Sequence, residues 1–377
     1  MGLFSNKESY LGVDIGANGI KLVELHTTKG RPQLWTYAMA DSPLDIHIKS
    51  SPSKSPKELI DESKHRLTPS KKEMPQGLDD PRIAKYAKIL KGLLKEARVT
   101  TKKTTASLPV SYVFHAVLTL PEADDKELGR MVTAEVEKML PRPIDEMQVV
   151  HQKIPQSKSD KEKKYIHVLV TAAPKDLVRF YTAIFQRAGL ELQELETEAF
   201  AIERSLVGRD SATSMVVDIG AERTNFFIID SSLPLVHRSI NIGGNTFDKI
   251  IEQTLDIENS LVLQIKKDVS RIKNKLNPEI FMPALEPIIK EIEYGFDLFL
   301  SQIGNEGKKP EKIILTGGSA VLPFIADEIK KNFDMKVFVG DPWARVVYQE
   351  GLKPVLDDIG PRMSVSIGLA LRNIIKD

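Results

Sequence analysis

The sequence predicts an α/β protein of two related halves, with a small additional α+β lobe inserted into the first half. The string Val-Asp-Ile-Gly-Ala occurs at 13–17 and again at 217–221, each time at the end of an apolar strand and before a hairpin. Between about 110 and 192 a different succession of strands and helices interrupts this pattern. Two distant copies of one element, each opening a similar group of strands, indicate two α/β units that face each other.

Composition limits the classes of protein to be considered. The chain has 377 residues, enough for two or three compact lobes. Its 53 Lys and Arg against 52 Asp and Glu leave a net charge of +1, which gives no reason to expect nucleic acid or an anionic membrane as a partner. The absence of Cys excludes disulfides, thiolate zinc sites and cysteine nucleophiles. Short apolar runs and a start without the form of a signal peptide favour a cytoplasmic protein.

The first half is predicted to begin with a hairpin whose turn lies at 16–19. Pro, Ser and Lys dominate at 42–81, where we expect a surface insert without regular structure. Apolar residues with helical spacing predict a helix at 81–98. Strands are predicted at 10–14, 20–26, 33–40 and 103–108.

The inserted lobe is expected at 111–192. Its second helix has Pro174 at the start and Gly189 at the end, an asymmetry typical of helix termini. We predict strands at 113–120, 148–154 and 165–172 and helices at 124–140 and 174–188.

The second half repeats the opening of the first. Helices are expected up to about residue 303, with interruptions near Pro278 and Pro283. A loop rich in Pro and Gly is expected before a final helix at 364–375. The remaining predicted elements are strands at 215–218, 225–230, 235–241, 313–315 and 337–339, and a helix that ends near residue 331.

The repeated strand ends carry residue types that bind a metal and a phosphate. Mg²⁺ in proteins usually keeps several waters and takes few carboxylates directly, so we expect Asp14 and Asp218 to hold it through water. The glycine after each Asp lets backbone N–H groups approach a phosphate, and Lys21 can reach one as a point charge. The candidate phosphate-binding residues are Gly16, Ala17, Asn18, Gly19, Lys21, Gly220, Ala221, Thr224 and Asn225.

Two Gly-Gly pairs at strand-to-helix turns complete the candidate site. Gly243 and Gly244 follow the third strand of the second half, and Gly317, Gly318 and Ser319 follow a later strand. Such a pair leaves room for a flat adenosine and offers free N–H groups at the start of a helix.

The two Val-Asp-Ile-Gly-Ala strings and the two Gly-Gly pairs resemble the phosphate and adenosine motifs of the superfamily of actin, hexokinase and the heat-shock chaperones. Within that superfamily the chain is similar to the PilM family of type IV pilus assembly proteins over nearly its whole length. The similarity is carried by the opening at 11–25, Pro-Arg-Pro-Ile at 141–144, Glu-Ala-Phe-Ala at 198–201, Gly-Gly-Asn-Thr-Phe-Asp at 243–248 and Ile-Gly-Leu-Ala-Leu-Arg at 367–372.

The resemblance implies an actin-like (ribonuclease H-like) two-half ATPase fold with an extra α+β subdomain like that of FtsA. It places ATP and Mg²⁺ in the cleft between the halves, with Lys266 contacting the nucleotide. It divides the chain into a first half at 1–110 and 193–212, the inserted lobe at 111–192, a second half at 213–250 and 309–345, a helical subdomain at 251–308, and a C-terminal segment at 346–377 that packs back on the first half.

The resemblance also implies partners. It predicts binding to the N-terminal cytoplasmic peptide of PilN, which would hold the chain on the inner face of the cytoplasmic membrane without insertion. It predicts a link to the cytoplasmic motor ATPases of the pilus, with self-association as a further hypothesis and no nucleic acid. We expect the peptide to lie near the small lobe, because extended peptides commonly add to exposed sheet edges or apolar clefts.

Three other functions stay open. Glu222 and Arg223 stand where family members often have Ser or Thr, and Leu263 replaces a glutamate that contacts nucleotide in related proteins, so a scaffold without nucleotide is one alternative. An FtsA-like filament protein and, less favoured, a sugar or metabolite kinase are the others. No residue stands out as positioning a water for hydrolysis, so the catalytic residues are unknown, with Asp14 and Asp218 as candidates.

Overall fold

A computed structural model gives the structure of the chain. It describes residues 8–46, 75, 77–140, 142–154, 165–267, 277–302, 304–305 and 307–375. Most of the insert expected at 42–81 lies outside these residues.

The first five-stranded sheet has the strand order β3-β2-β1-β4-β8. β1, β2 and β3 are antiparallel neighbours, whereas β1, β4 and β8 run parallel. The strands are β1 Ser9–Gly16, β2 Gly19–Thr28, β3 Arg31–Asp41, β4 Lys103–Leu108 and β8 Glu191–Thr197. The helices that pack on it are α2 Arg82–Glu96, α4 Lys175–Ala188 and α11 Lys353–Leu371.

Alternation along β2 shows why this sheet is covered on both faces. Successive side chains of a strand point to opposite faces. Leu22 therefore joins the core with α2 and α4, whereas Val23 and Leu25 join the core with α11.

The second five-stranded sheet has the order β11-β10-β9-β12-β13, the same succession of antiparallel and parallel neighbours as the first. The prediction of two related halves is thereby confirmed. Its strands are β9 Ser214–Ile219, β10 Thr224–Asp230, β11 Leu233–Ile240, β12 Lys312–Thr316 and β13 Lys336–Val339. The helices of this half are α6 Gly244–Leu255, α7 Asn259–Lys267, α9 Met282–Leu300 and α10 Pro323–Asn332.

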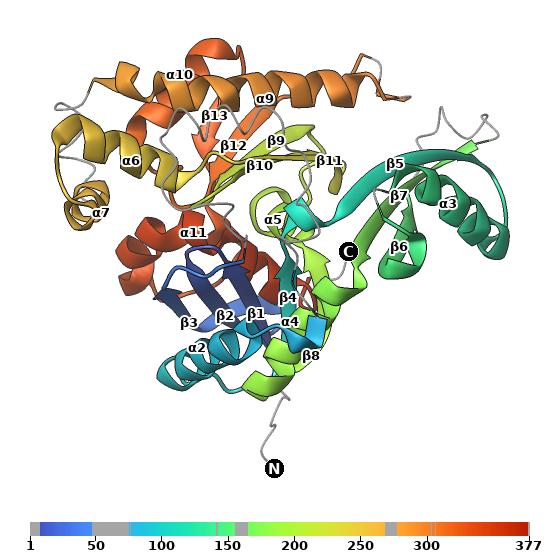
Figure 1. The fold of residues 1–377 in the computed structure, drawn as a ribbon, viewed down its shortest axis with the longest axis horizontal. Coiled ribbons are helices and arrows are strands. Elements are labelled where there is room, and N and C mark those ends of the chain that lie inside the picture. Colours follow the sequence, from blue (N-terminus) through green and yellow to red (C-terminus); the bar gives the residue numbers. More distant parts are fainter. Residues whose placement is uncertain are drawn as a thin grey trace.

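A three-stranded antiparallel sheet of order β5-β7-β6 forms the inserted lobe. Its elements are β5 Phe114–Pro121, α3 Asp125–Met139, β6 Met147–Lys153 and β7 Tyr165–Pro174. The lobe has a core of its own, in which Leu128 and Val132 of α3 pack on Val168 and Val170 of β7. The following helix, α4, instead packs in the core of the first half. Figure 1 shows the lobe projecting to the right of the two larger sheets.

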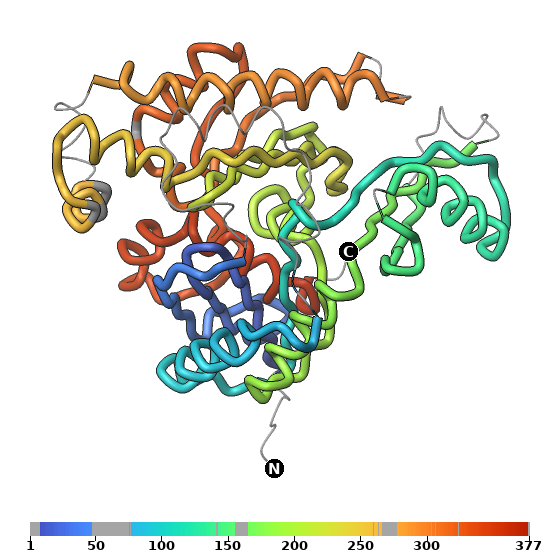
Figure 2. The backbone as a smooth tube through the Cα atoms, in the orientation of Figure 1, coloured from blue at the N-terminus to red at the C-terminus, as the bar shows by residue number. Residues whose placement is uncertain are grey.

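Two helical segments connect the halves. One is α5 Glu198–Ile202 with the π-helical turn Glu203–Val207, and the other is α11. They cross where a Cβ on Gly368 would lie 1.8 Å from the carbonyl oxygen of Ala201. In Figure 2 the first half lies in the lower part of the view and the second half in the upper part. Short 3₁₀ turns occur at Gly77–Asp79, Val110–Tyr112, Ile144–Glu146, Pro278–Phe281, Pro342–Arg345 and Glu350–Leu352.

The final helix begins earlier than the sequence predicts. We expected a Pro- and Gly-rich loop up to residue 363, but α11 starts at Lys353 and contains Pro361. The carbonyl oxygen of Pro361 accepts hydrogen bonds from the backbone N–H of Gly317 at 2.9 Å and from Oγ1 of Thr316 at 3.0 Å. These tertiary contacts tie the carbonyl of Pro361 to the end of β12, although the proline nitrogen cannot donate a helix hydrogen bond. β8 and α5 were not predicted from the sequence, because their side chains follow neither the strand period nor the helix period clearly.

Candidate functional site

The carboxyl ends of parallel strands from both sheets meet between the halves. Asp14 lies at the end of β1 opposite Lys21 of β2, and Asp218 lies at the end of β9 opposite Asn225 of β10. The two halves thus present the same strand positions to each other, one with an ammonium group and the other with an amide beside its aspartate. In open α/β sheets ligands bind outside the carboxyl ends of the strands. The sequence predicted these four residues, and the structure brings them together.

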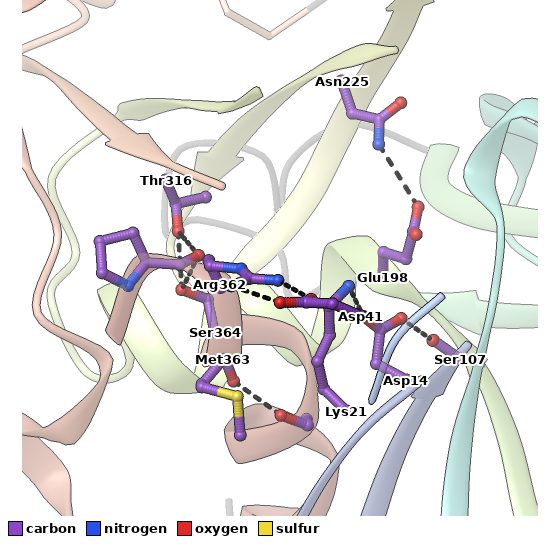
Figure 3. Close-up of polar contacts among 12 residues, drawn as sticks. Asp14, Lys21, Asp41, Ser107, Glu198, Asn225, Thr316, Arg362, Met363 and Ser364 are labelled. Carbon is purple, nitrogen blue, oxygen red and sulfur yellow. Dashed lines mark hydrogen bonds and ion pairs between the residues drawn. The ribbon is translucent and has the colours of Figure 1, made fainter. Parts of the chain in front are cut away.

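Asp14 is held in one orientation by two donors. Its Oδ2 accepts from Nζ of Lys21 at 3.2 Å, and its Oδ1 accepts from Oγ of Ser107 on β4 at 3.1 Å. Only 6% of Asp14 is exposed, and Figure 3 shows the three side chains converging at the strand ends. Ser107 was not among the sequence candidates. Its position could have been inferred, because β4 was predicted and a parallel neighbour of β1 would end at the same edge.

Asp218 is partly buried close to the other acids. Burial, followed by the negative charge of Asp14, raises its pKa to about 6, while Lys21 and a side-chain hydrogen bond from Asn225 lower it. Oδ1 of Asn225 is buried and makes no hydrogen bond. An unsatisfied buried acceptor and an acid with a raised pKa are both stabilised by a cation or its bound water.

Glu198, at the start of α5, is the functional candidate that sequence reasoning missed. Its Oε2 accepts from the backbone N–H of Val110 at 3.3 Å and from Nδ2 of Asn225 at 3.4 Å. Burial, followed by the charges of Asp14 and Asp218, raises the pKa of Glu198 to about 8. Glu198 therefore holds a proton at neutral pH. The residue directly follows β8, a parallel neighbour of β4, so recognising that strand would have placed it at the same edge.

The first turn, between β1 and β2, is closely packed against its neighbours. Gly19 has φ +124°, and a Cβ there would lie 1.8 Å from the carbonyl oxygen of Ala40 on β3. The carbonyl of Ala17 accepts from the N–H of Leu44 at 2.8 Å, and Asn18 is exposed. A Cβ on Gly16 would lie 3.1 Å from Nζ of Lys21, so glycine leaves this ammonium room to move.

The second turn, between β9 and β10, is hydrogen-bonded to the backbone at the start of α6. The N–H of Gly244 donates to the carbonyl of Gly220, and the N–H of Asn245 donates to that of Ala221, each at 2.8 Å. The amide of Gly244 is therefore not free, contrary to the expectation from the sequence. A Cβ on Gly243 would lie 2.7 Å from the carbonyl oxygen of Gly220, which explains glycine there. The hydroxyl of Thr224, likewise, donates to the carbonyl of Ile242 at 2.7 Å.

The third turn, which follows β12, lies directly against Asp218. Gly317 has φ +88°, and its Cβ would lie 2.6 Å from Oδ1 of Asp218. Ser319 is buried, and its N–H donates to the carbonyl of Ile219 at 3.3 Å. Gly318 faces the aliphatic part of Arg362 on α11, whose guanidinium pairs with Asp41 at the end of β3 (Figure 3).

Lys266 belongs to α7, but its side chain lies outside the described part of the structure, as does that of Leu263. Their expected role at the nucleotide stays a prediction.

The donor set fits a hydrated cation and a phosphate group. Asp14 and Asp218 bring two carboxyl groups together beside Glu198, and Lys21 supplies a movable positive charge next to them. Among the described residues, no three His, Asp or Glu side chains are placed to enclose a metal ion. Two carboxyl groups such as Asp14 and Asp218 suit an ion that keeps most of its waters, as Mg²⁺ does.

No helix in the described ranges is long and apolar enough to cross a membrane.

Comparison with known proteins gives the family. The model of the family "Type IV pilus assembly protein PilM" matches residues 70–374. A chain of the PilM-PilN type IV pilus biogenesis complex is similar in structure, with a TM-score of 0.76 and 24% identity over 97% of this chain and 99% of that chain. The ethanolamine utilization protein EutJ from Carboxydothermus hydrogenoformans gives a TM-score of 0.51 and 16% identity, over 97% of this chain and 89% of its own. Since the family model spans well over half of the sequence, this chain belongs to the PilM family of type IV pilus assembly proteins and has an actin-like ATPase fold.

Proposed function

We propose that this chain works in type IV pilus assembly by binding ATP with Mg²⁺ between its two halves and the N-terminal cytoplasmic tail of PilN at its inserted lobe. The observation that carries the nucleotide part is the meeting of Asp14 and Lys21 from one half with Asp218 and Asn225 from the other, around Glu198. Through the PilN tail the chain would sit on the inner face of the cytoplasmic membrane.

Each residue at the strand ends has a distinct task in this proposal. Asp14 and Asp218 hold Mg²⁺ through its waters, and the ion supplies positive charge that offsets their repulsion from the phosphates. Nζ of Lys21, 3.2 Å from Asp14, exchanges that carboxylate for a phosphate oxygen. Glu198 holds a proton at neutral pH, so it can lie near a phosphate without adding a full negative charge.

Isothermal titration calorimetry with ATP and Mg²⁺ tests the nucleotide part. The wild type should bind saturably, and Asp14→Ala or Lys21→Ala should weaken binding at least about tenfold, because the first removes a carboxylate that holds the hydrated Mg²⁺ and the second removes the positive charge that meets the phosphates. The control is Asp334→Ala, an exposed carboxylate after α10, which should leave the affinity unchanged. A flat wild-type trace would contradict the proposal.

The partner part is supported by the family and by the open edge of the lobe. The similar solved structure is a complex of PilM with PilN. β6 lies at the edge of its sheet, paired with β7 alone among the described strands, and Val150 on it is 61% exposed. An exposed strand edge accepts an extended peptide as an additional strand, with side-chain pockets giving specificity.

Fluorescence anisotropy with a labelled peptide of the PilN cytoplasmic tail tests this placement. Val150→Glu should weaken binding about tenfold or more, because it places a charge against the docked strand. Val355→Glu on α11 is the matched control, since Val355 is 51% exposed and distant from the lobe in sequence and fold.

Excision of the lobe provides a second test. Phe114 and Ala172 are paired across β5 and β7, so a short Gly-Ser linker can replace residues 114–172 and leave α4 in the core of the first half. The excised protein should lose peptide binding and keep nucleotide binding. Full peptide affinity after excision would show that the tail binds elsewhere on the molecule.

A scaffold without nucleotide is favoured by one specific observation. The amide of Gly244 and the hydroxyl of Thr224 are both engaged within the protein, so the second turn offers fewer donors than the sequence suggests. Peptide binding with no detectable nucleotide binding would identify the chain as such a scaffold. Links to motor ATPases and self-association stay predictions from the family.

A further inference from the structure

The first sheet has a second end, opposite the candidate nucleotide site. β1, β4 and β8 begin there, and β2 turns into β3 there. Oγ1 of Thr101 donates to the carbonyl of Ser9 at 3.2 Å, and the N–H of Glu191 donates to the carbonyl of Lys102 at 2.9 Å, which ties these chain ends together. The first half occupies the lower part of Figure 2, so this end faces away from the second half.

Exposed positive charge is concentrated at this end. We call its exposed residues the basal face. Three of them are acidic and seven are basic, although the whole chain has a net charge of only +1. The acidic residues are Glu8, Glu96 and Glu191, and the basic residues are Lys29, Arg31, Lys95, Arg98, Lys102, Lys103 and Arg187.

Helix stability accounts for only part of this charge. Lys95 and Arg187 lie in the last turns of α2 and α4, where cations interact favourably with the helix dipole. Lys29 and Arg31 instead flank the tip of the β2–β3 turn, and Lys102 precedes β4. These positions gain nothing from a helix terminus, so the excess of basic residues needs another explanation.

An exposed indole is held rigidly at the side of the same face. Trp35 is 53% exposed and stacks on the ring of His26, with ring centroids 4.4 Å apart and planes 12° apart. Nε2 of His26 lies 3.1 Å from Oε1 of the fully buried Glu24, whose Oε2 accepts from the N–H of Thr100 at 2.8 Å. Glu24 therefore holds the imidazole of His26 in place. The indole of Trp35 stacks on this imidazole with one face, and its other face is exposed to solvent.

We propose that the basal face lies against the surface of an anionic lipid bilayer, with Trp35 at the level of the headgroups. Lys and Arg near such a surface are attracted by its negative potential. The amphipathic indole of Trp favours the membrane–water interface. This surface goes beyond the nucleotide and peptide sites and depends on neither, because it lies at the opposite edge of the sheet.

Vesicle flotation tests the proposal with the full chain. Wild-type protein should float with vesicles of phosphatidylethanolamine and phosphatidylglycerol, less so at high salt, and should stay unbound with phosphatidylcholine alone. Lys29→Glu with Arg31→Glu should lower the bound-to-free ratio roughly tenfold or more. The matched control is Lys330→Glu with Lys336→Glu, an equal charge change on exposed residues of the second half, which should bind as the wild type does.

Tryptophan fluorescence gives an independent reading of orientation. The chain has two Trp, and Trp343 is only 1% exposed, with its Nε1 donating to the carbonyl of Leu356 at 2.9 Å. A blue shift on addition of anionic vesicles should therefore come from Trp35 and disappear in Trp35→Phe. Absence of wild-type binding to anionic vesicles overturns the proposal. So does an equal loss of binding in the control pair, or a blue shift that persists in Trp35→Phe.

Discussion

Three carboxyl groups at the junction of the halves have different surroundings. Asp14 is compensated by Lys21 and Ser107, whereas Asp218 and Glu198 are buried with less compensation. Removing a carboxylate from water disfavours its charged form, and a neighbouring negative charge adds to that effect. Burial and the neighbouring acids therefore raise the pKa of Asp218 to about 6 and that of Glu198 to about 8.

The raised pKa of Glu198 predicts a pH-dependent stability in the absence of nucleotide and Mg²⁺. The folded state keeps a proton up to about pH 8, whereas the unfolded state releases it near pH 4.5. The unfolding free energy contributed by this group is thus present below pH 4.5 and is lost as the pH rises towards 8. Glu198→Gln should remove this loss and be more stable than the wild type at pH 8, by up to roughly 4 kcal/mol.

Urea unfolding at pH 5 and at pH 8 measures this difference. Glu96→Gln, at an exposed position on α2, is the control and should follow the wild type at both pH values. A Glu198→Gln variant that loses stability with pH as steeply as the wild type would contradict the assigned proton.

At the scale of elements, the two glycines of the turn after β12 differ in how strictly the fold requires them. Gly317 is required by its positive φ and by the approach of Asp218, whereas a Cβ on Gly318 would meet only the side chain of Arg362, at 3.6 Å. The Gly-Gly pair thus contains one position fixed by the fold and one open to a side chain. Sequence alone gives both glycines equal weight, because the contacts that distinguish them come from Asp218 and Arg362, which are distant in the sequence.

Gly317→Ala and Gly318→Ala form a matched pair of substitutions. The first should lower the unfolding free energy by roughly 1–3 kcal/mol through backbone strain alone, and it should displace the Asp218 carboxylate. The second should change stability little. Thermal unfolding with nucleotide titration of both variants measures these effects, and equal stability of the two would show that the turn relaxes freely.

At the scale of the whole molecule, the two halves are joined by helices that cross without an intervening side chain. Nε of Arg204, buried on the π-helical turn, donates to the carbonyl of Gly368 at 3.0 Å, and its guanidinium pairs with Glu196. α11 also contacts the second half through Thr316 and Ser364, whose hydroxyl oxygens are 2.6 Å apart. These contacts fix α11 to the π-helical turn and to the second half close to both aspartate-bearing sheets.

Gly368→Ala should therefore disturb the relation between the halves. Its Cβ would lie 1.8 Å from the carbonyl oxygen of Ala201, so we expect a loss of about 3 kcal/mol or more, or a changed solution shape. Gly351→Ala is the control, because a Cβ there meets nothing within 4 Å. Chemical unfolding and small-angle X-ray scattering check the two outcomes, and a Gly368→Ala protein identical to the wild type in both would refute the close crossing.

The sequence by itself determined the duplicated α/β plan, the residues at both strand ends and the glycine turns, because each is a local demand of strand periodicity or backbone approach. Only the tertiary structure decided which groups share one site. It brought Glu198 and Ser107 to the acids, engaged the amide of Gly244 and gathered the basal face. These outcomes depend on which distant strand ends become neighbours and on how much water they exclude, and no local stretch of the chain encodes that.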